Sequence, residues 1–325
     1  MLLSIGAIII GLAILVWSAD KFVEGATATA NHLGVPILLI GMIVVGFGTS
    51  APEMVVAAIA AMEGNPNLAL GNAFGSNIAN IAFILGITAV LAPIVVHSNI
   101  VKKEMPILLV ITIVPGIMIL NAEISSFEAI LLLVGFVAVM GWQIYTSLKN
   151  KNDPLVEEEA EELEGLDMSK KEGILWLIAG IILLIISSKI LVWGAVDIAT
   201  RFGVSDLIIG LTIVAIGTSL PELAAAIAAV KKGEHDLAIG NVVGSNMFNI
   251  LLVIGVGAVI TPMTNIPAEA LYRDFLVMLG LTIALFVMAY GFKGNTPKIT
   301  RFEGTILLIS FFTYMGVLIY TAMPA

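Results

Sequence analysis

Two glutamates occupy equivalent places deep inside long apolar stretches of this 325-residue chain. Glu53 and Glu222 each end the sequence Gly-Thr-Ser-x-Pro-Glu. An ionised carboxylate is expensive to bury among apolar groups, and these two stretches carry Lys or Arg only at their ends. We therefore expect the positive partner to be a metal ion or protons. A structural ion pair or a glutamate kept protonated is the alternative interpretation.

The residues around each glutamate offer oxygen ligands. Pro52 and Pro221 lack a backbone donor, so each frees the carbonyl four residues earlier, at Gly48 and Gly217. The kinks would present those carbonyls beside four hydroxyls, those of Thr49, Ser50, Thr218 and Ser219. An all-oxygen set suits calcium, whereas zinc, copper and iron favour His or Cys. The chain has no cysteine, and its histidines lie at the ends of apolar stretches or in loops: His32, His97 and His235.

A second polar motif, Gly-Ser-Asn-x-x-Asn, follows each glutamate motif. It places Ser76 with Asn80, and Ser245 with Asn249, at i and i+4, so each pair shares one helix face. Taken alone, Ser and Asn at these places indicate hydrogen bonds between membrane helices. Because a glutamate motif precedes both copies, we expect these Ser and Asn side chains to bind the ion or to hold its ligands in position.

The motifs recur because the chain contains one unit twice. An offset of 169 residues carries Glu53 onto Glu222, and it also aligns the second motif and the Gly-Asn pairs at 71–72 and 240–241. The offset spans five apolar stretches, an odd number, so the two copies must cross a membrane in opposite directions. Inverted repeats are typical of transporters, with the site near the midplane at the repeat interface.

The elements that position these residues are predicted to be transmembrane helices. The chain is 59% hydrophobic and only 12% charged, which excludes a soluble globular class. Its net charge of −9 and lack of a basic patch exclude nucleic-acid binding. We predict an all-α polytopic membrane protein whose ten helices form two inverted five-helix repeats. The predicted spans are 2–31, 37–60, 69–92, 104–120, 126–147, 173–199, 206–230, 237–260, 274–291 and 303–321.

The positions of Lys and Arg predict the orientation. With both termini outside, the cytoplasmic loops hold 11 of the 15 basic residues. Repeat 1 is then 1–147, repeat 2 is 173–325, and 148–172 is an acidic cytoplasmic linker. The first residues lack a basic segment and are interpreted as a transmembrane helix rather than a cleaved signal peptide. A prokaryotic inner membrane is the simplest expected location.

Together these motifs resemble the alpha repeats of the sodium/calcium exchanger family, within the cation/calcium antiporter superfamily. The resemblance covers nearly the whole chain, and it implies antiport of calcium against sodium by alternating access. It implies that Glu53 and Glu222 are shared ion ligands and that the first and sixth spans slide against the other helices. Further ligand oxygens would come from Thr49, Ser50, Thr218, Ser219, Ser76, Asn80 and Ser245, and from the carbonyls of Gly46 and Ala215.

Two departures from the family pattern are visible. Some exchangers have an acid where this chain has Asn249, and here both repeats carry Asn, at 80 and 249; with only two carboxylates to balance the ions, the stoichiometry and the coupling ion stay open. The central loop also lacks large calcium-regulatory domains, so regulation of that kind is not expected. Proton-coupled exchange of calcium or another divalent cation therefore stays the alternative. A cation channel and an intramembrane hydrolase fit less well, because the chain carries its own pseudo-twofold repeat and has no hydrolase motif. We expect no enzyme activity, no cofactor and no obligate protein partner, only calcium and sodium ions and the lipid bilayer.

Overall fold

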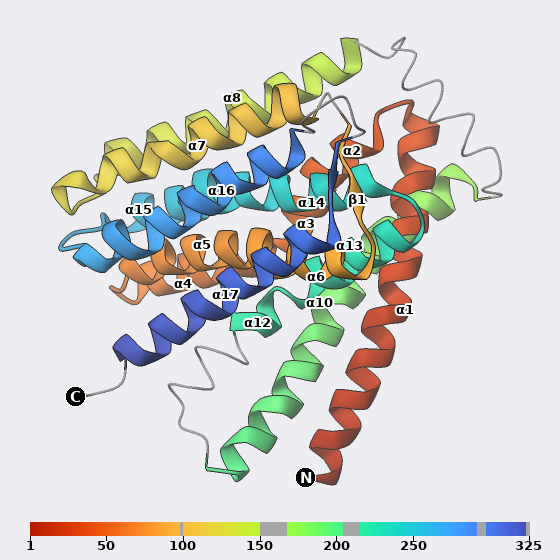
Figure 1. Cartoon of the computed structure of the whole chain (residues 1–325), viewed down its shortest axis with the longest axis horizontal. Helices are drawn as coiled ribbons and strands as arrows, with labels where there is room; N and C mark the ends of the chain where they lie inside the picture. The colour runs from red at the N-terminus through yellow and green to blue at the C-terminus, as the bar shows by residue number, and fades with distance from the viewer. Residues whose placement is uncertain (98–99, 150–167, 204–214, 291–296, 323–325) are drawn as a thin grey trace.

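A computed structural model describes residues 1–97, 100–149, 168–203, 215–290 and 297–322 (Figure 1). Within these ranges, 8 helices are long and apolar enough to cross a membrane, and a bent pair over 37–62 makes a further span. The seventh predicted span, 206–230, begins in 204–214, which lies outside the described residues. The central part of the predicted linker, 150–167, also lies outside them.

The starts of equivalent helices in the two halves are offset by 168 to 175 residues, from 168 for α1 and α10 to 175 for α8 and α17. The first half comprises α1 (Leu2–Leu33), α2 (Ile37–Leu39), α3 (Gly46–Thr49), α4 (Ala51–Met62), α5 (Asn67–Ile78), α6 (Gly86–Leu91), α7 (Met105–Met118), the 3₁₀ turn Ile119–Asn121 and α8 (Ser126–Lys149). The second comprises α10 (Lys170–Arg201), α12 (Ala215–Thr218), α13 (Leu220–Lys231), α14 (His235–Phe248), α15 (Ile254–Ile260), α16 (Leu276–Ala289) and α17 (Arg301–Ala322).

Both glutamate motifs interrupt a helix, as the prolines predict. Ser50 (φ −84°, ψ 1°) separates α3 from α4, and the two parts of this span are bent by 42°. Ser219 (φ −92°, ψ 4°) separates α12 from α13 in the same way. Pro52 and Pro221 lie in the first turn of the following helices, where their missing N–H leaves no intrahelical bond unmade. The break therefore lies three residues before each glutamate.

Single π-helical turns are the local feature that the sequence analysis did not predict. They cover Ile40–Val45 (η1), Ala79–Leu85 (η2), Ile100–Glu104 (η3), Asn249–Val253 (η6) and Ala270–Phe275 (η7). In both repeats one such turn joins the second polar motif to the rest of its span, at η2 and at η6. Such turns are frequent at functional sites.

The core of the molecule is formed by the third span of each repeat. Asn67–Leu91 and His235–Ile260 are 72% and 78% buried, whereas the other long spans are between 22% and 39% buried. Those outer helices expose large apolar side chains such as Trp17, Trp142 and Phe302, as a lipid-facing surface requires. The two central spans carry both copies of the second polar motif.

Close helix approach in this core depends on glycine. A Cβ on Gly244 in α14 would lie 2.2 Å from the backbone oxygen of Met42 in η1. The backbones of α14 and η1 therefore approach so closely that only glycine fits at position 244.

We expect Gly244→Ala to destabilise the protein by roughly 1–3 kcal/mol, the usual cost of overpacking. The backbone of η1 would have to move, because the clash is with main-chain atoms rather than with a flexible side chain. Thermal unfolding of the detergent-solubilised protein measures this effect. Gly141→Ala in α8 is the control, because Gly141 is exposed and no described atom lies within 4 Å of a Cβ placed there. An equal loss in both variants would contradict the prediction.

Two short strand pairings are additions to the predicted all-α fold. β1 (Ile94–Val95) pairs antiparallel with β2 (Lys298–Ile299), and an isolated bridge joins Ile124 to Met263. Ile94 and Met263 are equivalent residues of the two repeats, each just after its third span. Each pairing ties that connection to the segment before the last span of the other repeat.

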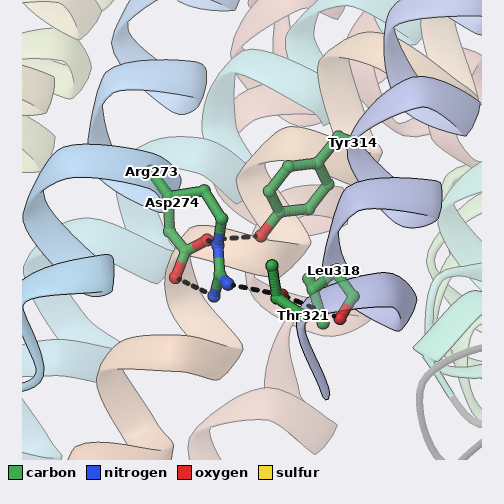
Figure 2. A network of polar contacts seen from close by, with 5 residues as sticks. All are labelled: Arg273, Asp274, Tyr314, Leu318 and Thr321. Carbon is green, nitrogen blue, oxygen red and sulfur yellow. Dashed lines mark hydrogen bonds and ion pairs between the residues drawn. The ribbon is translucent and has the colours of Figure 1, made fainter. Parts of the chain in front are cut away.

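A polar network fixes the start of the ninth span against α17 (Figure 2). Arg273 and Asp274 pair through Nε and Oδ1 at 2.7 Å, and the Tyr314 hydroxyl donates to Asp274 Oδ1 at 3.0 Å. Arg273 Nη1 also donates to Thr321 Oγ1 at 3.1 Å. Charged groups near the end of a span are thus paired rather than left facing lipid.

α1 and α10 lie side by side and extend beyond the other helices (Figure 1). Glycines allow the approach, because a Cβ on Gly25 would lie 2.5 Å from Leu177 N and one on Gly180 would lie 2.6 Å from Phe22 Cβ. These two helices are the first and sixth predicted spans. Their mutual packing makes them one paired unit beside the core.

Candidate ion-binding site

Both glutamates lie in the first turn of a helix that starts at the break. Glu53 is in α4 and Glu222 is in α13, and their exposed fractions are 3% and 2%. The N-terminal end of a helix stabilises a nearby carboxylate through the helix dipole. The charge of Glu53 acts on the Glu222 carboxyl, so the two side chains lie near each other. The structure therefore brings together the two acids that the sequence singled out.

Several buried oxygens at this place have no hydrogen-bond partner. Among the described residues, Glu53 Oε2, Glu222 Oε2, Ser50 Oγ and Asn249 Oδ1 are in this condition. Leaving such groups unsatisfied costs free energy, and a cation that accepts their lone pairs would remove that cost. The described residues contain no cluster of three or more His, Cys, Asp or Glu. The donor set is thus two carboxylates with neutral oxygens.

Thr49 joins the two repeats at the site. Its Oγ1 lies 3.0 Å from the Val45 carbonyl, 3.3 Å from Asn241 Oδ1 and 3.5 Å from Ser245 Oγ. It also faces the side chain of Glu222. A hydroxyl of repeat 1 is therefore held among side chains of repeat 2. A cation that binds the lone pairs of Thr49 would contact both halves at once.

The carbonyls of Gly48 and Gly217, four residues before each proline, have different surroundings in the two repeats. The Gly217 carbonyl accepts a bond of 2.6 Å from Ser188 Oγ on α10. The position equivalent to Ser188 is Ala19, which has no hydroxyl to offer Gly48. Gly46 O accepts from Ser50 N at 3.1 Å, so one lone pair is engaged within its own helix. Ala215 begins α12, and its side chain lies outside the described set.

The asparagines of the second motif form matching bonds across the repeat interface. Asn80 Nδ2 donates to Asn246 Oδ1 at 3.0 Å, and Asn249 Nδ2 donates to Asn77 Oδ1 at 3.1 Å. Asn77 Nδ2 also donates to the Asn246 carbonyl at 3.2 Å. These amides are buried in the two central spans. They hold η2 and η6 in register beside the glutamates.

Of the residues singled out in the sequence, the described hydroxyls and amides beside the glutamates are buried or nearly so. Ser50, Ser76, Ser219 and Ser245 are all buried, and Thr218 ends α12 at the break. Asn241 is not among the predicted site residues, yet its Nδ2 donates to the Glu222 carbonyl at 3.3 Å. The repeated Gly-Asn pair was a signal for it. Ser188 could not be found by comparing repeats, because its counterpart is Ala19.

Comparisons with known proteins agree with this geometry. The sodium/calcium exchanger protein family matches residues 3–145 and 172–320. The chain belongs to the sodium/calcium exchanger family. It is 44% identical to CaxA of Alkalimonas amylolytica over 312 residues, covering 96% of this chain and 97% of that protein. It is 38% identical to the inner membrane protein YrbG of Escherichia coli (strain K12) over 324 residues, covering 98% and 97%.

The fold agrees with solved structures of the sodium-calcium exchanger NCX_Mj. One of them aligns with a TM-score of 0.82 at 30% identity, covering 98% of this chain and 99% of that one. The predicted fold class, ten transmembrane helices as two inverted five-helix repeats, is thereby confirmed. The protein is a multi-pass membrane antiporter of this family, which transports ions and is not a family of enzymes.

Proposed function

We propose that this exchanger moves calcium against sodium through the site built around Glu53 and Glu222. The observation that carries the proposal is the pair of buried carboxylates, each with an oxygen that lacks a hydrogen-bond partner. They lie at the interface between the two repeats, where an ion can be exposed to one side of the membrane and then to the other.

The chemistry of the ligand set favours a hard cation. Calcium takes six to eight oxygen ligands in flexible geometry, and the charge of two carboxylates matches one calcium ion. Supporting ligands would be the hydroxyls and amides of Thr49, Thr218, Ser50, Ser219, Ser76, Ser245, Asn80 and Asn249, with the carbonyls of Gly46 and Ala215. The NCX_Mj structures were obtained after soaking with Na⁺, Ca²⁺ or Sr²⁺, which supports the same ion class here.

Proton-coupled exchange of a divalent cation is the second candidate. The favouring observation is the same pair of carboxylates, because two buried acids close together can be neutralised by protons as well as by sodium. Proton/calcium exchangers of the same superfamily usually carry Asn-Ala before the glutamate, whereas proline precedes both Glu53 and Glu222 here. This difference supports sodium as the first choice. The two candidates differ in which gradient drives calcium.

The proposal also includes the orientation of the chain in the membrane and its division into repeats. We place both termini outside an inner membrane and the 148–172 linker in the cytoplasm, because most basic residues lie in the loops on that side. YrbG, a relative at 38% identity, is named as an inner membrane protein. The division into repeats at 1–147 and 173–325 follows the same proposal. No cofactor and no obligate protein partner are part of it.

Everted vesicles test the proposal directly. Vesicles loaded with labelled calcium should release it when sodium is added outside, and choline at the same ionic strength should not cause release. A pH gradient imposed at constant sodium is the parallel arm. Release driven by the pH gradient alone would show that protons, rather than sodium, are the coupling ion. No release in either arm would contradict the proposal of calcium exchange.

A further inference from the structure

The α1–α10 pair does not lie symmetrically between the two repeats. α1 packs along α13, while the equivalent packing of α10 along α4 is far weaker. α10 itself also rests on α12 and α13. All four helices are described, so the asymmetry belongs to the arrangement seen here. In an inverted-repeat transporter, the opposite arrangement corresponds to the state open on the other side.

Polar contacts hold the asymmetric arrangement at one end. Lys232 Nζ lies 3.1 Å from Glu24 Oε1, joining the turn after α13 to α1. Two residues further on, Glu234 Oε1 accepts from Thr27 Oγ1 at 3.2 Å. Glu24 is also paired with Lys21 at 2.7 Å within α1. The contact is thus a three-membered ion network with a second hydrogen bond beside it.

The turn that makes these contacts is fixed to the core on its other side. Asp236, at the start of α14, lies 2.7 Å from His97 Nδ1, which follows β1. A turn tied to the core by Asp236 and to α1 by Lys232 restrains the paired helices relative to the core. Its restraint acts at the end of the molecule where α1 and α13 terminate.

The other end of the molecule cannot form the same contacts. At the offset of 169 residues, Glu24 is replaced by Trp193 and Lys232 by Glu63. Thr27 is likewise replaced by Val196, and Glu234 by Asn65. If the pair moved into the mirrored arrangement, neither the ion pair nor the hydroxyl–carboxylate bond would have a counterpart. The repeats are therefore symmetric in fold and asymmetric in this restraint.

We propose that Glu24–Lys232, together with Thr27–Glu234, is a latch that favours the state closed at the end where α1 and α13 terminate. In the proposed orientation this end is cytoplasmic, so the resting exchanger is biased toward the outward-facing state. The inference rests on the proposed alternating-access exchange. Both latch side chains are partly exposed, with fractions of 32% for Lys232 and 24% for Glu24, so the bias is moderate.

Cysteine labelling tests the latch without measuring flux. The chain has no cysteine, so a single reporter gives an unambiguous signal. Ala30→Cys places one on α1, one turn beyond Thr27 on the same face, at a position only 2% exposed. Ala199→Cys places the equivalent reporter on α10. Rates of reaction with a water-soluble maleimide are measured on the full-length protein in detergent without sodium or calcium.

In the Lys232→Gln background we expect labelling of Cys at 30 to accelerate about two- to fivefold, the range typical of partly exposed ion pairs. Labelling at 199 should slow, because that end closes when the first one opens. Glu24→Gln should act in the same direction. Lys232→Arg should restore rates near those of the unchanged latch, and Lys231→Gln, at an exposed neighbouring lysine, should leave both rates unchanged.

Two results would overturn the latch. Unchanged labelling at 30 in both Lys232→Gln and Glu24→Gln means that the pair does not bias the states. Acceleration at both 30 and 199 means local loosening rather than a change of state. Neither result depends on which ions are exchanged, so failure of the latch is separable from failure of calcium exchange in the vesicle assay.

Discussion

Replacing either Glu53 or Glu222 by glutamine is expected to abolish sodium-dependent calcium release from vesicles. Removing one partner of a buried charge interaction costs about 3–5 kcal/mol, and each 1.4 kcal/mol is a factor of ten in affinity. Calcium affinity should therefore fall by a factor of about a hundred or more. Glutamine has nearly the same shape as glutamate, so the break at Ser50 and the packing of α4 need not change.

The same substitutions should increase the thermal stability of the ion-free protein. Two unpaired carboxylates buried close together are unfavourable, so Glu53→Gln should raise the melting temperature measured in a chelator. Added calcium should then stabilise the unaltered protein and leave the variant unmoved. A loss of both flux and ion-free stability would instead indicate misfolding.

Glu63→Gln is the matched control for this prediction. Glu63 follows the last turn of α4, the helix that begins beside Glu53, but its side chain is exposed. The substitution removes the same charge from the same segment without touching the buried site. If Glu63→Gln impaired calcium release as strongly as Glu53→Gln, a general loss of negative charge would explain both results, and the buried site would lose its support.

The fold could be predicted from the sequence because its determinants are local and repeated. The apolar spans, the odd number of spans per repeat and the prolines before Glu53 and Glu222 each act within a short segment. A single Ser-Asn pattern fits ordinary hydrogen bonds between helices as well as ion binding. Its occurrence twice, each time after a glutamate motif, favours ion binding. The break at Ser50 and the meeting of the two carboxylates follow from these features alone.

The parts that could not be predicted depend on differences between the repeats. Ser188 reaches the Gly217 carbonyl from α10, while Ala19 stands at the matching place in α1. The Glu24–Lys232 pair joins residues far apart in the chain and has no counterpart at the offset of 169 residues. Residues that the two halves share appear as a repeated pattern, whereas the residues that make their two ends different leave no such signal in the sequence.

The amide bonds between the repeats give the second large expected effect. Asn77→Ala removes the acceptor for Asn249 Nδ2 and the donor to the Asn246 carbonyl. Each buried group left without a partner costs about 1–3 kcal/mol. We therefore expect a lower melting temperature and weaker calcium binding, because η6 loses the bond that holds Asn249 in place.

Asn246→Ala should cost less than Asn77→Ala, although the two residues are equivalent in the repeats. Asn246 contributes one side-chain bond, from Asn80 Nδ2 to its Oδ1, and its backbone carbonyl is retained in the alanine variant. Asn65→Ala, at an exposed turn, is the control for loss of an amide as such. Melting temperatures should fall in the order Asn65→Ala, Asn246→Ala, Asn77→Ala, the last being the least stable. A reversed order of the two buried variants would mean that these amides do not join the repeats as described, since their difference comes only from the number of cross-repeat bonds that each side chain makes.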